Sequence, residues 1–425
     1  MTAKRVGTTL LVVLILVIAA GVAAGYVMGT FPEIAAITPP ARTSFDPAMV
    51  ERGRELAAVG NCASCHTAPN GQALAGGLAL QTPFGVIYSD NITPDPVSGI
   101  GTWSQAAFIR AMRDGIDRNG AHLYPAFPYT YFARLSTGDL DALYAYLMTR
   151  RPVHQEAPHD SLSFPFNIRM LMTGWNILFL DKSPVTADPH QSSTWNRGRY
   201  LVDALAHCGA CHAPRTLLEG QSSDAALSGG TAQGWTAPAL NARSPAPVRW
   251  TERQLETYLT TGLDRHHGAA AGPMREVTTA LARATPEDVQ AISVYIASLM
   301  PQTPQPHPAL SAPAANPTAV AIVSGVCANC HGANATIAEG RWPSLAASTT
   351  LQEASPRNVI QILRNGLPLP PPHGGAFMPA FANILSDAQI GDVANYLRTH
   401  VAGRPAWSNA TQLARKIRRA EKAAP

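Results

Sequence analysis

Six cysteines, each pair followed by a histidine, are the residues of this sequence whose spacing points most directly to chemistry. All cysteines of the chain fall into three copies of one C-x-x-C-H motif, namely Cys62-Ala-Ser-Cys65-His66, Cys208-Gly-Ala-Cys211-His212 and Cys327-Ala-Asn-Cys330-His331. In this motif two thioether bonds attach a c-type haem, and the adjacent histidine binds the iron from one side. The three copies therefore predict three covalently bound c-type haems.

Other uses of paired cysteines fit this pattern less well. A zinc ribbon needs C-x-x-C elements in pairs to supply four ligands, whereas this chain has an odd number of pairs. A thioredoxin-like motif needs a βαβ context, whereas the flanking segments have a helical pattern. Disulfide bonds stay open in principle for an exported chain. Haem attachment is the interpretation that explains every cysteine together with its histidine.

Each motif opens a module of helices that must hold the haem. A helical stretch in each module (103–114, 250–261 and 356–365) is followed by a glycine that we predict to be its C-cap. These glycines are Gly115, Gly262 and Gly366. A last helix then begins at Ser136, Thr285 or Ser386 and carries a tyrosine ten residues later. The matches form an internal repeat and predict an all-α fold of three small domains, each wrapped round one haem.

Two methionines occupy the position where a second iron ligand is needed. Met274 and Met378 each follow the capping glycine of their module by twelve residues. A methionine thioether can close the haem face opposite the histidine, and it raises the reduction potential. We therefore predict that both methionines are axial ligands.

The first module departs from this pattern, because Phe127 stands at the position of the methionine. Its haem is then either five-coordinate or bound by His122, and in both cases we expect it to have the lowest potential of the three. An open first haem would also permit a peroxidase-like activity as an alternative function. No catalytic constellation accompanies the haem motifs, and we interpret His266 and His267 as solvated loop residues.

The two ends of the chain suggest an export signal and a basic tail. Residues 6–31 carry no charge and follow Lys4 and Arg5, which predicts a membrane-spanning helix with the rest of the chain outside. A long cleaved signal peptide is the alternative. The predicted location is the periplasmic side of the inner membrane. Charged residues make up only 14% of the 425 residues, and this low charge argues against nucleic acid as a partner. Six of the basic residues lie in residues 402–425, the basic tail.

These signals predict a linear order of domains. The order is a transmembrane anchor or uncleaved signal (1–31), domain 1 (46–150), a connector with one helix (151–192), domain 2 (193–300), a proline-rich linker (301–316), domain 3 (317–401) and the basic tail (402–425).

The chain resembles the triple-haem cytochrome c subunits of membrane-bound bacterial dehydrogenases. The resemblance spans residues 46–400 and rests on the three motifs, on residues 197–215 (RGRYLVDALAHCGACHAPR), on HLYPAFPY (122–129) and on FMPAF (377–381). It implies three tandem cytochrome c domains after an N-terminal transmembrane helix, and electron transfer without substrate chemistry. It also implies a periplasmic catalytic subunit as donor, either an alcohol, gluconate or fructose dehydrogenase or a molybdenum hydroxylase. The implied acceptor is quinone or a terminal oxidase.

Overall fold

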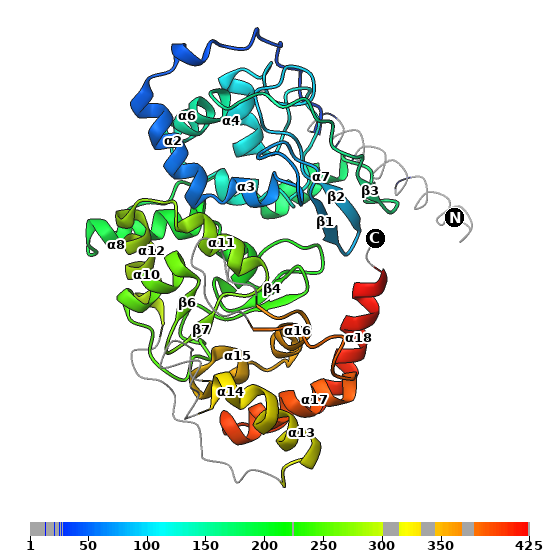
Figure 1. The fold of residues 1–425 in the computed structure, drawn as a ribbon. Coiled ribbons are helices and arrows are strands. Elements are labelled where there is room, and N and C mark those ends of the chain that lie inside the picture. The colour runs from blue at the N-terminus through cyan, green and yellow to red at the C-terminus, as the bar shows by residue number, and fades with distance from the viewer. Residues whose placement is uncertain are drawn as a thin grey trace, which may run out of the picture. The chain divides into compact units, whose positions relative to one another are not determined.

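The computed structural model describes residues 13, 21, 25, 27, 29–222, 225–300, 314–332, 345–367 and 378–423. The chain divides into two compact units (Figure 1). Unit 1 comprises Met1–Thr186, Asp203–His207 and Leu217–Gly220. Unit 2 comprises Ala187–Val202, Cys208–Thr216 and Gln221–Pro425.

Unit 1 contains the first haem motif within a small helical domain. Its helices are α2 (Pro47–Val59), α3 (Cys62–Cys65), α4 (Gln105–Asp114), α5 (Tyr129–Phe132), α6 (Thr137–Met148) and α7 (Leu171–Phe179), and a 3-10 turn precedes them at Arg42–Ser44. Its strands β1 (Ala79–Thr82), β2 (Gly85–Tyr88) and β3 (Ser161–Leu162) form one antiparallel sheet. The predicted connector therefore supplies both a helix and the third strand of this sheet.

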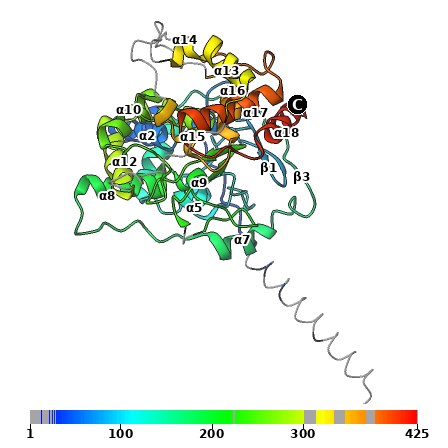
Figure 2. The same cartoon turned by 90° about the horizontal axis from the view of Figure 1, so that it is seen from below.

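Unit 2 contains the second and third motifs. Its first part consists of α8 (Ser193–Tyr200), α9 (Gly209–His212), α10 (Glu252–Thr261), α11 (Pro273–Leu281) and α12 (Pro286–Leu299), with the hairpins β4–β5 (Gly230–Ala232, Trp235–Ala237) and β6–β7 (Leu263–Asp264, Gly268–Ala269). A π-helical turn at Leu201–Leu205 follows α8. Its second part consists of α13 (Pro317–Ile322), α14 (Ala328–His331), α15 (Thr349–Gln352), α16 (Arg357–Asn365), α17 (Asp387–Tyr396) and α18 (Ala410–Ala423), with short 3-10 and π-helical turns between them (Figure 2).

Helix ends in the structure confirm the capping residues predicted from the repeat. Gly115, Gly262 and Gly366 end α4, α10 and α16 with φ of 63°, 72° and 69°, a left-handed region that favours glycine. The final helices α6, α12 and α17 begin after Ser136, Thr285 and Ser386, each of which accepts a hydrogen bond from a backbone N–H. These local signals fix where the helices of each module begin and end.

Glycines let the first and last helices of two modules pack closely. A Cβ atom at Gly53 of α2 would lie 1.9 Å from the carbonyl oxygen of Ala142 in α6. A Cβ atom at Gly198 of α8 would likewise lie 1.9 Å from the carbonyl oxygen of Ala291 in α12. The preceding arginines pair with equivalent aspartates on the partner helices, at 3.2 Å for Arg52–Asp139 and 2.8 Å for Arg197–Asp288. The repeat predicted from sequence therefore extends to the packing of the helices.

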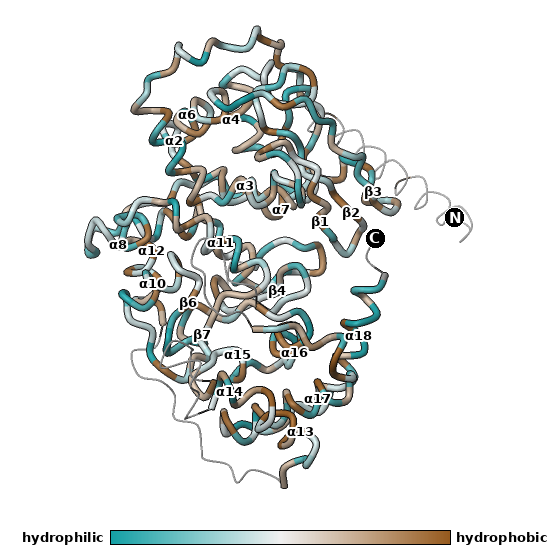
Figure 3. The backbone as a smooth tube through the Cα atoms, in the orientation of Figure 1, coloured by the Kyte–Doolittle hydropathy of each residue, from teal (hydrophilic) through white to brown (hydrophobic). Residues whose placement is uncertain are grey.

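Helix α18 completes the hydrophobic core of the last module. Its Ala410, Ala414 and Ile417 are buried against residues of α16 and α17 such as Ile360 and Ile390. Its opposite side is exposed and basic, and most of its length is hydrophilic in Figure 3. Part of the predicted basic tail is therefore a packed helix.

The prediction of an all-α fold is wrong, because both units contain short antiparallel strands. The β4–β5 hairpin turns at Gln233 and Gly234, whose φ values are 48° and 78°. Two consecutive residues with positive φ form the tight turn that matches the twist of a hairpin. Strands of two to four residues carry too little periodicity to stand out beside the helical pattern that dominates the sequence.

The predicted N-terminal membrane anchor is also corrected. In the described part of the chain, no helix combines the length and the apolar composition needed to cross a bilayer. The predicted anchor and the inner-membrane location that depended on it are therefore not supported. Most of residues 1–31, and residues 301–313 of the proline-rich linker, lie outside the described residues.

Candidate haem-binding sites

The first motif forms a single helical turn that presents its histidine to a backbone carbonyl. The His66 N–H donates to the Cys62 carbonyl at 3.0 Å, and the His66 ring nitrogen Nδ1 lies 2.6 Å from the Asp90 carbonyl oxygen. A carbonyl only accepts, so Nδ1 carries the proton and Nε2 is left with its lone pair for a metal. Burial lowers the pKa of His66, which keeps the ring neutral as iron ligation requires.

The second motif repeats this geometry. The His212 Nδ1 lies 2.7 Å from the Pro238 carbonyl oxygen, and burial lowers the pKa of this ring as well. The backbone carbonyl of each histidine accepts from a glycine N–H at 2.8 Å, Gly76 in the first module and Gly229 in the second. Two histidines held in the same way in two modules indicate one shared purpose for both rings.

The third motif is described as far as residue 332. Cys330 and His331 lie in the short helix α14, directly after a π-helical turn that ends at Cys327. The His331 Nδ1 is buried and has no hydrogen-bond partner among the residues that the structure describes. Residues 333–344, which follow in the chain, lie outside that part. The pKa of His331 is lowered by burial, like those of the other two histidines.

The donor atoms of these motifs fit a covalently attached haem. None of the six cysteines is joined to another in a disulfide bond, so the structure holds none of the disulfide bonds that the sequence left open. Burial, with a smaller contribution from the neighbouring Cys65, raises the pKa of the Cys62 thiol to about 12. The pKa values of Cys211 and Cys327 are raised by burial as well. In the described residues no cluster of three or more histidine, cysteine or acidic side chains could hold a metal ion.

The two predicted methionine ligands lie in different local structures. Met274 stands in the first turn of α11, whereas Met378 forms an isolated bridge with Leu367. The loop 368–377 that leads to Met378 lies outside the described residues. The two methionines therefore have the same spacing of twelve residues from the capping glycine in sequence, but different backbone conformations. Their role as iron ligands stays a prediction.

His122, the candidate sixth ligand of the first haem, is buried in a polar contact of its own. Its Nε2 lies 3.0 Å from the Gly29 carbonyl oxygen and 3.1 Å from the Thr173 hydroxyl. Its Nδ1 is buried and has no hydrogen-bond partner in the described part of the chain. Binding iron through Nε2 would require these contacts to break. Phe127 instead packs against the ring of Phe132, with 5.5 Å between the centroids.

His267 is buried, so its prediction as a solvated loop residue is wrong. It is 5% exposed and stacks on Trp250 with 3.5 Å between ring centroids. Burial lowers its pKa to about 4, which the nearby Asp264 only partly offsets. The adjacent His266 is exposed as predicted. Two neighbouring histidines in a polar loop give no sequence signal that separates the buried one from the exposed one.

The buried His267 predicts acid sensitivity of unit 2. Its folded pKa of about 4 lies below the ordinary value of 6.5, so the unfolded chain binds more protons between these two pH values. The contribution of the neutral His267 to the free energy of unfolding is fully present above pH 6.5. It is lost as the pH drops toward 4, with a slope of up to about 1.4 kcal/mol per pH unit. We expect His267→Phe, which keeps an aromatic ring, to reduce this slope in denaturant titrations across the range. His266→Phe is the matched control, and an equal effect of both variants would contradict the prediction.

Two protein families match separate parts of the chain. Residues 50–151 match the family described as "Cytochrome c". Residues 314–397 match the family described as "Cytochrome C oxidase, cbb3-type, subunit III". These ranges contain the first and the third C-x-x-C-H motifs, and the second motif lies between them.

Several curated relatives match most of the chain. The fructose dehydrogenase cytochrome subunit of Gluconobacter japonicus is 36% identical over 406 residues, which cover 88% of this chain and 83% of the relative. The gluconate 2-dehydrogenase cytochrome c subunit of Pantoea cypripedii is 36% identical over 375 residues, which cover 83% and 85%. A nicotinate dehydrogenase subunit of Pseudomonas putida is 46% identical over 411 residues. That match covers 94% of this chain, which thus spans about a third (34%) of this relative.

These relatives confirm the resemblance that the three motifs predicted. They agree with the structure, in which two motif histidines are held to carbonyl oxygens and keep a free ring nitrogen. The chain therefore belongs to the cytochrome c subunits of dehydrogenases, which carry covalently bound c-type haem.

Proposed function

We propose that this chain takes electrons from the catalytic subunit of a dehydrogenase and passes them through three covalently attached haems to quinone or a terminal oxidase. Electron transfer as a cytochrome c subunit is the function that its family shows. The peroxidase-like alternative has no support among these relatives. The single observation that carries the proposal for the haems is the matching geometry of His66 and His212. Each histidine follows a pair of cysteines, and its Nδ1 is held by a backbone carbonyl oxygen, which leaves Nε2 for the iron. The third haem rests on the third motif.

The donor that we propose is a catalytic subunit of the nicotinate dehydrogenase kind. The identity to the nicotinate dehydrogenase subunit is 46%, against 33–37% for the alcohol, fructose and gluconate dehydrogenase cytochrome subunits and a dihaem cytochrome.

The donor can be tested with the cytochrome purified together with its natural catalytic partner. Nicotinate, an aldehyde, fructose, gluconate and ethanol are added in turn, and haem reduction is followed in the visible spectrum. We expect reduction by nicotinate or the aldehyde. Reduction by fructose, gluconate or ethanol alone would place the chain with the sugar and alcohol enzymes and would contradict the proposed donor.

Replacing the proposed methionine ligands is expected to lower two reduction potentials. Without a thioether ligand the oxidised iron is favoured. Met274→Leu and Met378→Leu are therefore each expected to lower the reduction potential of one haem by a substantial part of the ~0.8 V range that axial ligands span. Spectroelectrochemical titration of the haem-loaded protein measures this shift, together with loss of the methionine-to-iron absorption band. Met148→Leu is the control, because Met148 is a core residue at 2% exposure. Unchanged potentials in either ligand variant would remove that methionine from the site.

A further inference from the structure

The backbone carbonyl that holds His66 belongs to Asp90, and the next residue in the chain, Asn91, is buried. The Asp90 oxygen, which accepts from His66 Nδ1, lies in the peptide group that joins Asp90 to Asn91. The direction of this oxygen therefore depends on how the backbone of Asn91 is held. Asn91 is 3% exposed, and its side chain makes more polar contacts than a surface loop requires.

Asn91 ties the loop after β2 to the segment that follows α6. Its amide nitrogen Nδ2 donates to the carbonyl oxygens of Val153 at 2.7 Å and Gln155 at 3.2 Å, and it lies 3.1 Å from the Ser98 hydroxyl. Its Oδ1 accepts from the N–H and the hydroxyl of Thr93 at 2.9 and 2.7 Å. The amide thus uses both of its ends within one buried site.

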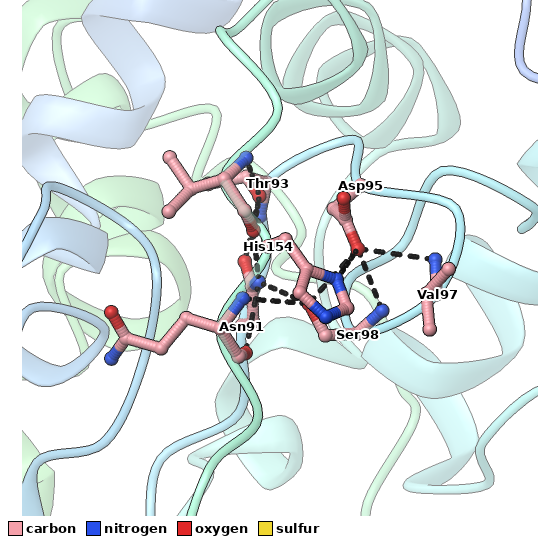
Figure 4. Close-up of polar contacts among 8 residues, drawn as sticks. Asn91, Thr93, Asp95, Val97, Ser98 and His154 are labelled. Carbon is pink, nitrogen blue, oxygen red and sulfur yellow. Dashed lines mark hydrogen bonds and ion pairs between the residues drawn. The ribbon is translucent and has the colours of Figure 1, made fainter.

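The surrounding polar groups hold this arrangement in place (Figure 4). The Thr93 hydroxyl accepts from the Val153 N–H at 3.1 Å, and the Ser98 hydroxyl accepts from the Gln155 N–H at 2.9 Å. Asp95 accepts from the Ser98 N–H at 2.7 Å and pairs with His154 at 3.3 Å. Hydrogen bonds to Ser98 lower the pKa of Asp95, which keeps it ionised. We call Asn91, Thr93, Asp95, Ser98, and residues 153–155 the Asn91 clamp.

The second module has the same backbone geometry without this clamp. The Ile92 N–H donates to the Leu74 carbonyl at 2.9 Å, and the Leu240 N–H donates to the Leu227 carbonyl at 2.8 Å. Counting from these bonds, Asp90 corresponds to Pro238 and Asn91 corresponds to Ala239. Alanine has no polar side-chain atom, so the Pro238 carbonyl receives no such tie. Of the two modules in which the structure describes this loop, only the first has the clamp, so the clamp is not needed to form the loop.

We propose that Asn91 is a positioning residue that sets the reduction potential of the first haem through the Asp90 carbonyl and His66. A hydrogen bond from the ring nitrogen opposite the metal orients a histidine ligand and makes it more basic. A more basic ligand favours the oxidised iron and lowers the potential. This bond is short, at 2.6 Å, and in this proposal the clamp holds the Asp90 carbonyl in the position that the bond needs. This inference rests on haem attachment at Cys62, Cys65 and His66, and it does not depend on the identity of the electron donor.

The test is a redox titration of the haem-loaded, full-length protein and its Asn91→Ala variant. We expect one of the three haem reduction potentials to rise in Asn91→Ala while the other two stay unchanged. That potential must differ from those that Met274→Leu and Met378→Leu lower, which assigns it to the first haem. Paramagnetic NMR of the His66 ring is expected to show a changed Nδ1 proton resonance. The titration needs no dehydrogenase, so its outcome is independent of the donor experiment above.

Two further variants keep the test decisive. Ser98→Ala removes one partner of the Asn91 amide and is expected to raise the same reduction potential by a smaller amount. This variant keeps the proposal testable if Asn91→Ala fails to fold. Asn241→Ala in the second module is the matched control, because Asn241 corresponds to Thr93 and donates to the Ala226 carbonyl at 3.0 Å. An equal shift in Asn241→Ala would mean that loosening any such loop moves a potential, and would overturn the proposal. Unchanged potentials in Asn91→Ala beside a lowered melting temperature would leave Asn91 a purely structural residue and would overturn it as well.

Discussion

Replacement of Cys62 and Cys65 by alanine is expected to remove one covalently bound haem and to abolish electron transfer from the dehydrogenase. The two thiols and His66 are the donor atoms of the first attachment site, and neither cysteine is in a disulfide bond. Without thioether bonds the haem is held by coordination and apolar contact alone, so it is lost under denaturing conditions. Intact mass measured after denaturation checks this, with the mass falling by one haem in the double variant.

The same experiment in the other two motifs counts the haems. The pairs Cys208 with Cys211 and Cys327 with Cys330 are each expected to account for one further haem. The single variant Cys62→Ala keeps one thioether and retains the haem mass, which separates loss of attachment from loss of the fold. A double variant whose mass equals that of the unaltered protein apart from the two side chains would show that its motif carries no haem. The proposal of three haems would then fail at that motif.

Replacement of Gly53 by alanine is expected to destabilise unit 1 by about 3 kcal/mol, at the upper end of the cost of overpacking a core. The added Cβ would meet the Ala142 carbonyl oxygen at 1.9 Å and its carbon at 2.6 Å. Both are backbone atoms of α6, so the two helices must separate instead of a side chain moving aside. The Arg52–Asp139 pair beside this contact is strained by the same movement. Thermal unfolding measures the effect, and a fall of roughly 10 °C in the melting temperature is expected for a unit of this size.

Gly138 provides the matched control for Gly53. It also lies in a helix of unit 1, but it is exposed and a Cβ there meets no atom within 4 Å. Gly138→Ala is therefore expected to leave stability unchanged or to raise it by up to about 1 kcal/mol, because alanine has the higher helix propensity. Gly198→Ala tests the same contact in unit 2, where the added Cβ would lie 1.9 Å from the Ala291 carbonyl oxygen. Equal melting temperatures for Gly53→Ala and Gly138→Ala would refute the close packing of α2 on α6.

The Asn91 clamp explains how modules built on one repeat can differ in their redox properties. The first and second modules share their helix caps, the glycine contact and the histidine-to-carbonyl bond. They differ in the side chain next to the accepting carbonyl, which is Asn91 in one and Ala239 in the other. A relay needs haems of different potential, and a contact made by the neighbouring backbone can provide this without altering the attachment motif.

The sequence alone determined the features of this protein that depend on neighbours in the chain. A C-x-x-C-H motif brings two thiols and an imidazole together within one helical turn, so its chemistry can be predicted from the spacing. A glycine in the left-handed region and a serine or threonine before a helix act over one turn, which is why the predicted caps at Gly115, Gly262 and Gly366 were confirmed. The family resemblance rested on the C-x-x-C-H motifs and other short motifs, and the relatives confirm it.

Only the tertiary structure decided the features that depend on residues far apart in the chain. The carbonyls of Asp90 and Pro238 lie 24 and 26 residues after the histidines that they hold, and a residue of any type can supply such an oxygen from its backbone. The burial of His267 and the contacts of Asn91 with residues 153–155 arise from packing between segments that no local pattern connects. The short strands escaped prediction because pairing between segments, and not periodicity within them, makes them strands.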